Sequence, residues 1–184
     1  HLNEDCLEFA NEYRVKEILN KYCSFMPTEI FLEKENAPDE FETIELEEKK
    51  DSDKVIETIT EDEKEKLKIL KRPVPINETQ PLWTKNPSEC TDEDYKTFYR
   101  KVFHDYKEPL FWIHLNMDYP FNLKGILYFP KINTEYDTLE GTIKLYNNQV
   151  FIADNIKEVI PEFLMLLKGV IDCPDLPLNV SRSA

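Results

Sequence analysis

Two segments of the chain carry apolar residues at the spacing of an amphipathic helix. In the first, the apolar positions follow the i, i+3, i+4, i+7 pattern and end just before Pro27: Val15, Ile18, Leu19, Tyr22 and Met26. The second begins after Thr91, a good N-cap residue followed by three carboxylates that favour the helix dipole. Its apolar stripe comprises Tyr95, Phe98, Tyr99, Val102, Phe103 and Tyr106. We expect this stripe to lie in the core rather than to bind a cofactor.

Alternating apolar and polar positions predict strands in the second half of the chain. Residues 110–117 alternate between two faces, and residues 121–129 do the same after a turn at 118–120, so together they predict a hairpin. Residues 143–146 and 150–152 predict two short strands on either side of the polar triplet Asn147, Asn148 and Gln149. Residues 30–32 are also strand-like.

A last apolar-rich segment predicts a helix that packs on this sheet. Its apolar positions are Ile156, Val159, Ile160, Phe163, Leu164, Leu167, Val170 and Ile171. Pro161 suits a helix start or a kink between two helical pieces. A stiff segment with two prolines, Pro174 and Pro177, follows and leads to Arg182.

The composition changes between Glu33 and Lys68, where fifteen acidic and seven basic residues occur. We therefore treat the chain as one domain, 1–184, in which residues 36–72 form a charged, mobile insertion. Val55, Ile56 and Ile59 leave an edge strand open as an alternative, but the composition favours a mobile acidic loop.

Charge and composition exclude several classes of function. A net charge of −14 repels phosphate backbones and disfavours nucleic-acid binding. The three glycines cannot form GxxxxGK(S/T) or GxGxxG, the two Gly-rich motifs that bind nucleotide phosphates. Four widely spaced cysteines and three histidines do not predict a metal site, and reduced thiols fit a cytoplasmic protein. No apolar run is long enough for a membrane span.

Of five side chains that could carry chemistry or binding, only two tryptophans and one arginine suggest a function from the pattern alone. His104 and His114 have no evident nucleophile partner, so we assign both a structural role. Trp83 and Trp112 offer contact area to a protein partner, although core packing is the alternative for each. Arg182 follows a rigid loop, and its planar guanidinium could form forked hydrogen bonds to a phosphate brought by another domain.

Several strings of residues resemble one known family. They are residues 81–87 (PLWTKNP), 143–146 (IKLY), 150–155 (VFIADN), 160–163 (IPEF), 168–172 (KGVID) and 175–182 (DLPLNVSR). In order and spacing they are similar to the middle domain of bacterial heat-shock protein 90 chaperones. The resemblance covers about residues 4–35 and 75–184 and leaves the acidic segment unmatched.

The resemblance implies a fold and a setting for this chain. The fold is α+β: a layered α/β/α domain with a mixed, largely antiparallel sheet packed by amphipathic helices. In the family, an N-terminal domain binds ATP with Mg and a C-terminal domain dimerises, so this chain would be an inactive fragment of a cytoplasmic, homodimeric ATPase. Its partners would be the N-terminal domain of the same polypeptide and non-native client proteins.

The resemblance also assigns roles to individual residues. Arg182 matches the family arginine that reaches the ATP γ-phosphate when the N-terminal domain docks, and Leu176 and Leu178 would contact that domain. Tyr136 and Leu139 align with a loop that faces the N-terminal domain or clients. Trp83 matches a tryptophan associated with client contact, and Trp112 is a weaker candidate for the same role. The triplet Asn147, Asn148 and Gln149 replaces a typically basic stretch of the family.

One alternative of a different class remains open at this point. The chain could be a stand-alone interaction module whose aromatic surface binds one fixed partner without a nucleotide cycle. An independent enzyme is less well supported, because no nucleophile, metal cluster or phosphate cradle can be named.

Overall fold

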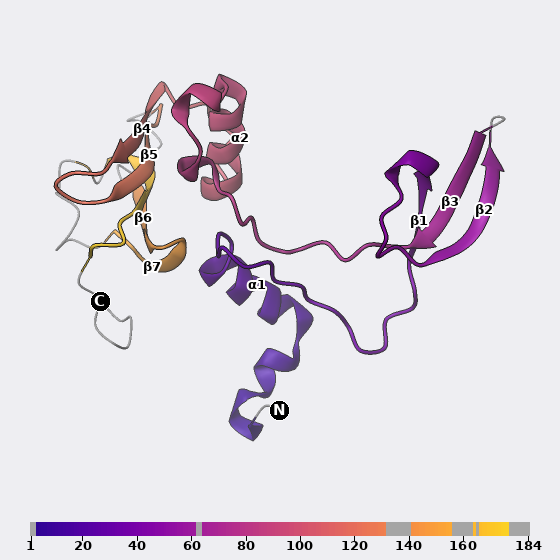
Figure 1. Ribbon diagram of the computed structural model, residues 1–184. Helices are drawn as coiled ribbons and strands as arrows, with labels where there is room; N and C mark the ends of the chain where they lie inside the picture. The colour runs from indigo at the N-terminus through magenta and orange to yellow at the C-terminus, as the bar shows by residue number, and fades with distance from the viewer. Residues whose placement is uncertain (1–2, 62–63, 132–140, 156–163, 165, 177–184) are drawn as a thin grey trace. The chain divides into compact units, whose positions relative to one another are not determined.

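The computed structural model describes residues 3–61, 64–131, 141–155, 164 and 166–176. The chain divides into two units, residues 1–29 with 77–184 and residues 30–76, which we describe separately (Figure 1).

Both helices predicted in the first hundred residues are confirmed. The helical elements among the described residues of the larger unit are η1 (Glu4–Ala10), α1 (Glu12–Tyr22), η3 (Leu82–Thr84), η4 (Pro87–Glu89) and α2 (Asp92–Phe103). Thr91 caps α2 in a capping box with Asp94, because its hydroxyl accepts from the Asp94 N–H and the Asp94 carboxylate accepts from the Thr91 N–H. The helix ends at His104, which adopts the left-handed conformation, so Tyr106 lies outside it and is exposed.

The larger unit contains a mixed five-stranded sheet. Its strands are β4 (Phe111–Met117), β5 (Leu123–Phe129), β6 (Thr142–Asn147), β7 (Val150–Asp154) and β8 (Lys168–Asp172). Their order is β4-β5-β8-β6-β7, and only the β6–β8 pair is parallel. The predicted β4–β5 hairpin and the two short strands β6 and β7 are confirmed, as is the α+β fold with a mixed, largely antiparallel sheet.

The prediction of a helix through residues 167–171 is wrong. Lys168–Asp172 form β8, the central strand, which is hydrogen-bonded to β5 on one side and β6 on the other. A strand buried on both faces reads as a continuous apolar run, and such a run cannot be told from a buried helix by periodicity alone. Residues 156–163, which carry the rest of that prediction, lie outside the described residues.

The glycines of β5 and β8 allow these two strands to pair closely. A Cβ at Gly125 would meet the carbonyl oxygen of Val170, and one at Gly169 would meet the side chain of Leu127. Both glycines therefore serve strand packing.

One face of the sheet packs against α2 and the segments before it. Ile126, Tyr128 and Val170 from the sheet are buried with Phe98 and Trp83 in a single core. The opposite face has its own buried cluster, consisting of Leu127, Ile143, Leu145, Leu167 and Ile171. Four residues of the predicted stripe, Tyr95, Phe98, Tyr99 and Val102, therefore lie in the core, as expected, whereas Tyr106 does not.

The smaller unit contains strands in the acidic segment, where we expected a loop. It contains β1 (Phe41–Glu45), η2 (Leu46–Glu48), β2 (Val55–Glu61) and β3 (Lys64–Leu70), and the strands form an antiparallel sheet of order β1-β3-β2. Residues 30–32, predicted as a strand, are not part of one.

Period-2 alternation explains why so charged a segment folds. Leu67 and Ile69 alternate with lysines along β3 and form a small core with Ile44. Oppositely charged residues face one another across the strands, as in Glu45 opposite Lys66. Net composition counts these charges but not their alternation, so it indicated a loop.

Amide hydrogen exchange tests this correction. We expect the amides of β3, which pairs with strands on both sides, to exchange more slowly than those of residues 49–54 between η2 and β2. Mass spectrometry of peptic peptides makes the comparison. Equally fast exchange in both segments would contradict the three-stranded sheet and support the mobile loop that we expected from composition.

Candidate functional site

Four of the predicted site residues lie outside the described residues: Tyr136, Leu139, Leu178 and Arg182. The start of the segment that leads to Arg182 is described, and we call Cys173–Leu176 the loop root. Leu176 is half-buried and packs against the cluster that contains Leu127 and Ile171. The loop root therefore leaves the sheet directly from the end of its central strand.

Trp83 lies in the core rather than on the surface. Its side chain is 1% exposed. The rings of Phe25, Tyr146 and Phe98 surround it at centroid distances of 4.7, 5.2 and 5.7 Å. Its position does not support the client contact assigned by resemblance and agrees with the core-packing alternative.

Trp112 has a mixed environment on β4. It is half-buried and stacks on Tyr95 at a centroid distance of 5.1 Å with an interplanar angle of 23°. On the other face of the same edge strand, Phe111, Ile113 and Met117 are each at least 43% exposed. β4 therefore presents apolar side chains within the described part of the chain.

The loop root is hydrogen-bonded to the β6–β7 hairpin. The Asn147 amide Nδ2 lies 3.3 Å from the Cys173 carbonyl oxygen and 3.1 Å from that of Pro174, and donates to both. The Cys173 N–H donates to the Tyr146 carbonyl at 3.1 Å. On the other side, the Asp175 carboxylate accepts from the Asn122 N–H at 2.7 Å. These contacts fix the direction in which the chain leaves β8.

We call Asn147–Gln149 the amide turn, because all three side chains are amides. Asn148 and Gln149 have φ values of 49° and 64°, as a two-residue hairpin turn between right-twisted strands requires. The Gln149 Nε2 donates to the carbonyls of Phe25 (2.7 Å) and Thr79 (2.9 Å). The amide turn therefore contacts the loop root through one side chain and the core segments through another.

Asp172, the last residue of β8, is a buried carboxylate beneath the amide turn. Its side chain oxygen Oδ2 accepts from the Trp83 indole N–H at 3.2 Å and from the Gln149 backbone N–H at 2.9 Å. Oδ1 is buried and has no hydrogen-bond partner within the described ranges. Burial raises the pKa of Asp172 above its ordinary value, although the hydrogen bonds from Trp83 and Gln149 and the charge of Lys124 oppose this.

Lys168 binds a second carboxylate at the other end of β8. Its Nζ lies 2.6 Å from Asp105 Oδ2, which also accepts from the Tyr99 hydroxyl at 2.8 Å. Burial raises the pKa of Asp105, but the hydrogen bonds from Lys168, the Lys107 backbone and Tyr99 outweigh it and leave the pKa below its ordinary value. Both ends of β8 are thus held by polar contacts with the α2 side of the unit.

His114 does not form a catalytic pair. Its Nδ1 lies 2.8 Å from the Tyr95 hydroxyl and its Nε2 lies 3.3 Å from the Trp83 carbonyl oxygen. Burial lowers the pKa of His114, which favours the neutral ring. Neutral imidazole between a hydroxyl and a carbonyl satisfies both nitrogens, so the structural role assigned from the sequence agrees with these contacts.

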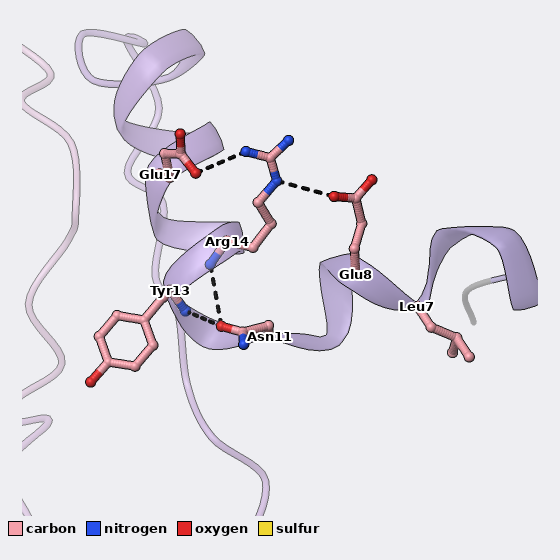
Figure 2. Close-up of a pocket in the computed structure, with 6 residues that line it drawn as sticks. All are labelled: Leu7, Glu8, Asn11, Tyr13, Arg14 and Glu17. Atoms are coloured by element: carbon pink, nitrogen blue, oxygen red, sulfur yellow. Dashed lines mark hydrogen bonds and ion pairs between the residues drawn. The ribbon is translucent and has the colours of Figure 1, made fainter.

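An open depression beside α1 does not suit an anionic ligand. It is lined by Leu7, Glu8, Asn11, Tyr13, Arg14 and Glu17 (Figure 2). The Arg14 guanidinium lies between the two carboxylates, 3.3 Å from Glu8 and 2.8 Å from Glu17, while Leu7 and Tyr13 point away from it. A phosphate would compete with both carboxylates for this cation.

Neither the strand glycines nor the metal-ligating side chain types of the described residues point to a phosphate or metal site. Gly125 and Gly169 lie in β5 and β8, so neither belongs to a phosphate-binding loop. Within residues 3–61, 64–131, 141–155, 164 and 166–176, no group of three or more His, Cys, Asp or Glu side chains could hold a metal ion. None of the helices in those ranges is both long and apolar enough to cross a membrane.

Asn147, Gln149 and Asp172 are parts of the site that were not predicted from the sequence. The three successive amides at a two-residue turn between predicted strands were a usable signal for a backbone-binding turn. Nothing in the sequence indicated that Asp172 is buried, because an acidic residue after an apolar run is typical of the start of a loop.

Comparison with known proteins identifies relatives of the whole chain. A family model described as "Hsp90 protein" matches residues 8–184. A protein named "Chaperone protein HtpG" from Bacteroides thetaiotaomicron is 50% identical over 183 residues, and one of the same name from Porphyromonas gingivalis is 44% identical over 183 residues. Both alignments cover 100% of this chain, so the similarity includes the acidic segment that the sequence analysis left unmatched.

The chain is much shorter than these relatives. It spans 23% of the length of each. Among solved structures, the "Middle domain of Plasmodium falciparum putative heat shock protein" is similar to 52% of this chain, with 33% sequence identity and a TM-score of 0.46, and 40% of that chain is covered.

The pH dependence of stability tests the buried state of Asp172. Its pKa is raised in the folded state, so between its ordinary pKa of 3.8 and the raised value the folded chain holds a proton that the unfolded chain has lost. The stability of the wild type should therefore fall relative to Asp172→Asn as pH rises through this window. Urea unfolding of both chains at a series of pH values measures the difference.

Asp154→Asn is the matched control, because it removes one exposed carboxylate from the same sheet. A difference between wild type and Asp172→Asn that stays constant across the window would contradict a raised pKa.

Proposed function

The chain belongs to the Hsp90 protein family, and from this premise we propose that it is the middle segment of an ATP-dependent molecular chaperone. In this role it binds non-native client proteins and supplies Arg182 to the γ-phosphate of ATP held by a separate N-terminal domain. One observation carries the proposal: 50% identity along the entire chain to a protein named as a chaperone.

Arg182 suits the charge that develops during phosphoryl transfer. Its guanidinium is delocalised, stays protonated and presents a planar fork of donors to phosphate oxygens. A cation that arrives only when the domains dock stabilises the transferring phosphoryl group and helps to exclude water. The hydrolysis of ATP then depends on domain closure, which couples turnover to the conformation of the chaperone.

The contacts at the loop root support this role. Hydrogen bonds from Asn147 and to Asp175 hold the root at the end of the central strand, and Leu176 packs into an apolar cluster. A fixed root and two prolines reduce the conformational freedom that the loop must lose on docking. Leu176 and Leu178 are the proposed apolar contacts with the N-terminal domain.

Client binding is proposed for apolar surfaces rather than for Trp83. Phe111, Ile113 and Met117 expose apolar area on β4, as a surface that binds non-native proteins requires. Tyr136 and Leu139 are proposed to contact the N-terminal domain or clients, and Trp112 is proposed to contribute to client contact from the other face of β4. We further propose that the full-length protein is a cytoplasmic homodimer that binds ATP with Mg mainly through its N-terminal domain.

Replacement of Arg182 in the full-length protein tests the proposal. Arg182→Ala should lower the turnover of ATP by about tenfold or more, with the roughly 10³- to 10⁵-fold contribution of arginine fingers as the upper bound, while the affinity for ATP changes little. Steady-state hydrolysis and nucleotide titration measure the two quantities.

Two variants serve as controls for the loss of a positive charge. Arg182→Lys keeps the charge but not the planar fork, so it should restore turnover only in part. Arg100→Ala removes a half-buried arginine of α2 that pairs with Glu93 and should leave turnover unchanged. Unaltered turnover in Arg182→Ala would contradict the proposal that Arg182 acts on the γ-phosphate.

A further inference from the structure

We propose that the open edge of β2 binds an extended polypeptide segment in which lysine or arginine alternates with apolar residues, and that this segment joins the smaller sheet as a fourth strand. The inference concerns the smaller unit alone and does not depend on the proposed role of Arg182. Within the described residues, β2 pairs with β3 only, so its other edge has no strand beside it (Figure 1).

The hydrogen bonds of β3 show which backbone groups of β2 point out of the sheet. The Leu70 N–H donates at 3.0 Å to the carbonyl of Lys54, just before β2, so Leu70 directs its backbone groups to that side. Successive residues of a strand alternate in this direction, so Leu67 directs its groups to β1. Thr58 lies opposite Leu67, and its own N–H and C=O therefore point away from β3. The same holds for Thr60, two residues further along.

The other edge of this sheet is less open. β1 has five residues, and the N–H of its last residue, Glu45, donates at 3.2 Å to the Glu48 carboxylate in the capping box of η2. β2 has seven residues, none of them proline or glycine, and Val55 and Ile56 are 40% and 56% exposed. A long, exposed edge strand rich in β-branched residues is a ready template for another strand.

A carboxylate of β2 lacks its cross-strand partner. Glu57 lies opposite Lys68, but the Lys68 Nζ lies 5.3 Å from the ring centroid of Phe41, on β1. Glu57 is exposed and forms no ion pair with another residue of the described ranges. A lysine or arginine on an added strand would lie opposite this carboxylate, where the Cβ atoms of paired residues are about 4.5–5.5 Å apart.

The pattern of β3 indicates what an added strand would carry. Along β3, lysines alternate with Leu67 and Ile69, which lie in the small core. A segment with this alternation would place cations beside Glu57 and apolar side chains beside Thr58, on the face of that core. A second copy of this chain fits less well, because fifteen acidic and seven basic residues between Glu33 and Lys68 make two such units repel each other.

A peptide with the sequence of residues 64–70 is the probe, because β3 already pairs with the inner edge of β2. Titration into the isotope-labelled 184-residue chain should shift the NMR signals of the Thr58 and Thr60 amides and slow their hydrogen exchange. Added salt should weaken binding, since it screens the charge pairs. A peptide with glutamate in place of each lysine should bind about tenfold more weakly, because it sets like charges against each other.

Three variants of the chain locate the binding edge. Thr58→Pro removes an outward N–H from β2 and should weaken binding about tenfold, since a backbone hydrogen bond is lost. Thr43→Pro is the matched control on β1: Thr43 lies opposite Lys68, which faces β2, so its N–H also points out of the sheet. This variant should bind the peptide like the wild type. Glu57→Gln leaves the backbone intact and should weaken binding about threefold and reduce its salt dependence.

The slow exchange of the β3 amides reports whether each variant keeps the sheet. Absence of binding, or equal affinity in the wild type and a folded Thr58→Pro, would overturn the inference. If Thr58→Pro loses the sheet, Glu57→Gln takes its place, and unchanged affinity and salt dependence in that variant would contradict the proposal. Shifts at Thr58 and Thr60 that arise without peptide as the chain is concentrated would also overturn it, because they would identify a second copy as the occupant.

Discussion

The larger unit depends on one buried carboxylate at the end of its central strand. Asp172 accepts hydrogen bonds from the indole of Trp83 and from the backbone of Gln149, and so joins three parts of the chain that are far apart in sequence. Burial raises the pKa of this carboxylate, and one of its two oxygens has no hydrogen-bond partner among the described residues, so its burial is costly. This contact determines where β8 ends and where the loop toward Arg182 begins.

The position of β8 explains how the fold serves the proposed function. The strand pairs with β5 and β6, and its first residue, Lys168, is bound to Asp105. A strand held along both edges and at both ends has little freedom to shift. A loop that starts from it has a fixed origin, while the prolines at 174 and 177 limit its variation beyond that point. The fold therefore supplies an immobile base for a residue that is proposed to act in another domain.

Local patterns predicted much of this architecture, and the errors have physical causes. Helical spacing gave α1 and α2, and alternation gave the β4–β5 hairpin and β6 with β7, because each buries one face. β8 was mistaken for helix because it is buried on both faces. The three strands of residues 41–70 were missed because net charge hid their alternation. Within the site, the roles of Arg182 and Leu176 were predicted from family resemblance. The hydrogen bonds of Asn147 and Asp172 could not be predicted, because they join segments that are distant in sequence.

The most direct test of the central claim is the position of the Arg182 guanidinium in the closed, full-length protein. A crystal structure with a non-hydrolysable ATP analogue would measure its distance to the γ-phosphate. The account predicts a hydrogen-bonded contact of about 2.7–2.9 Å to a phosphate oxygen. A guanidinium that points into solvent in that closed state would contradict the account.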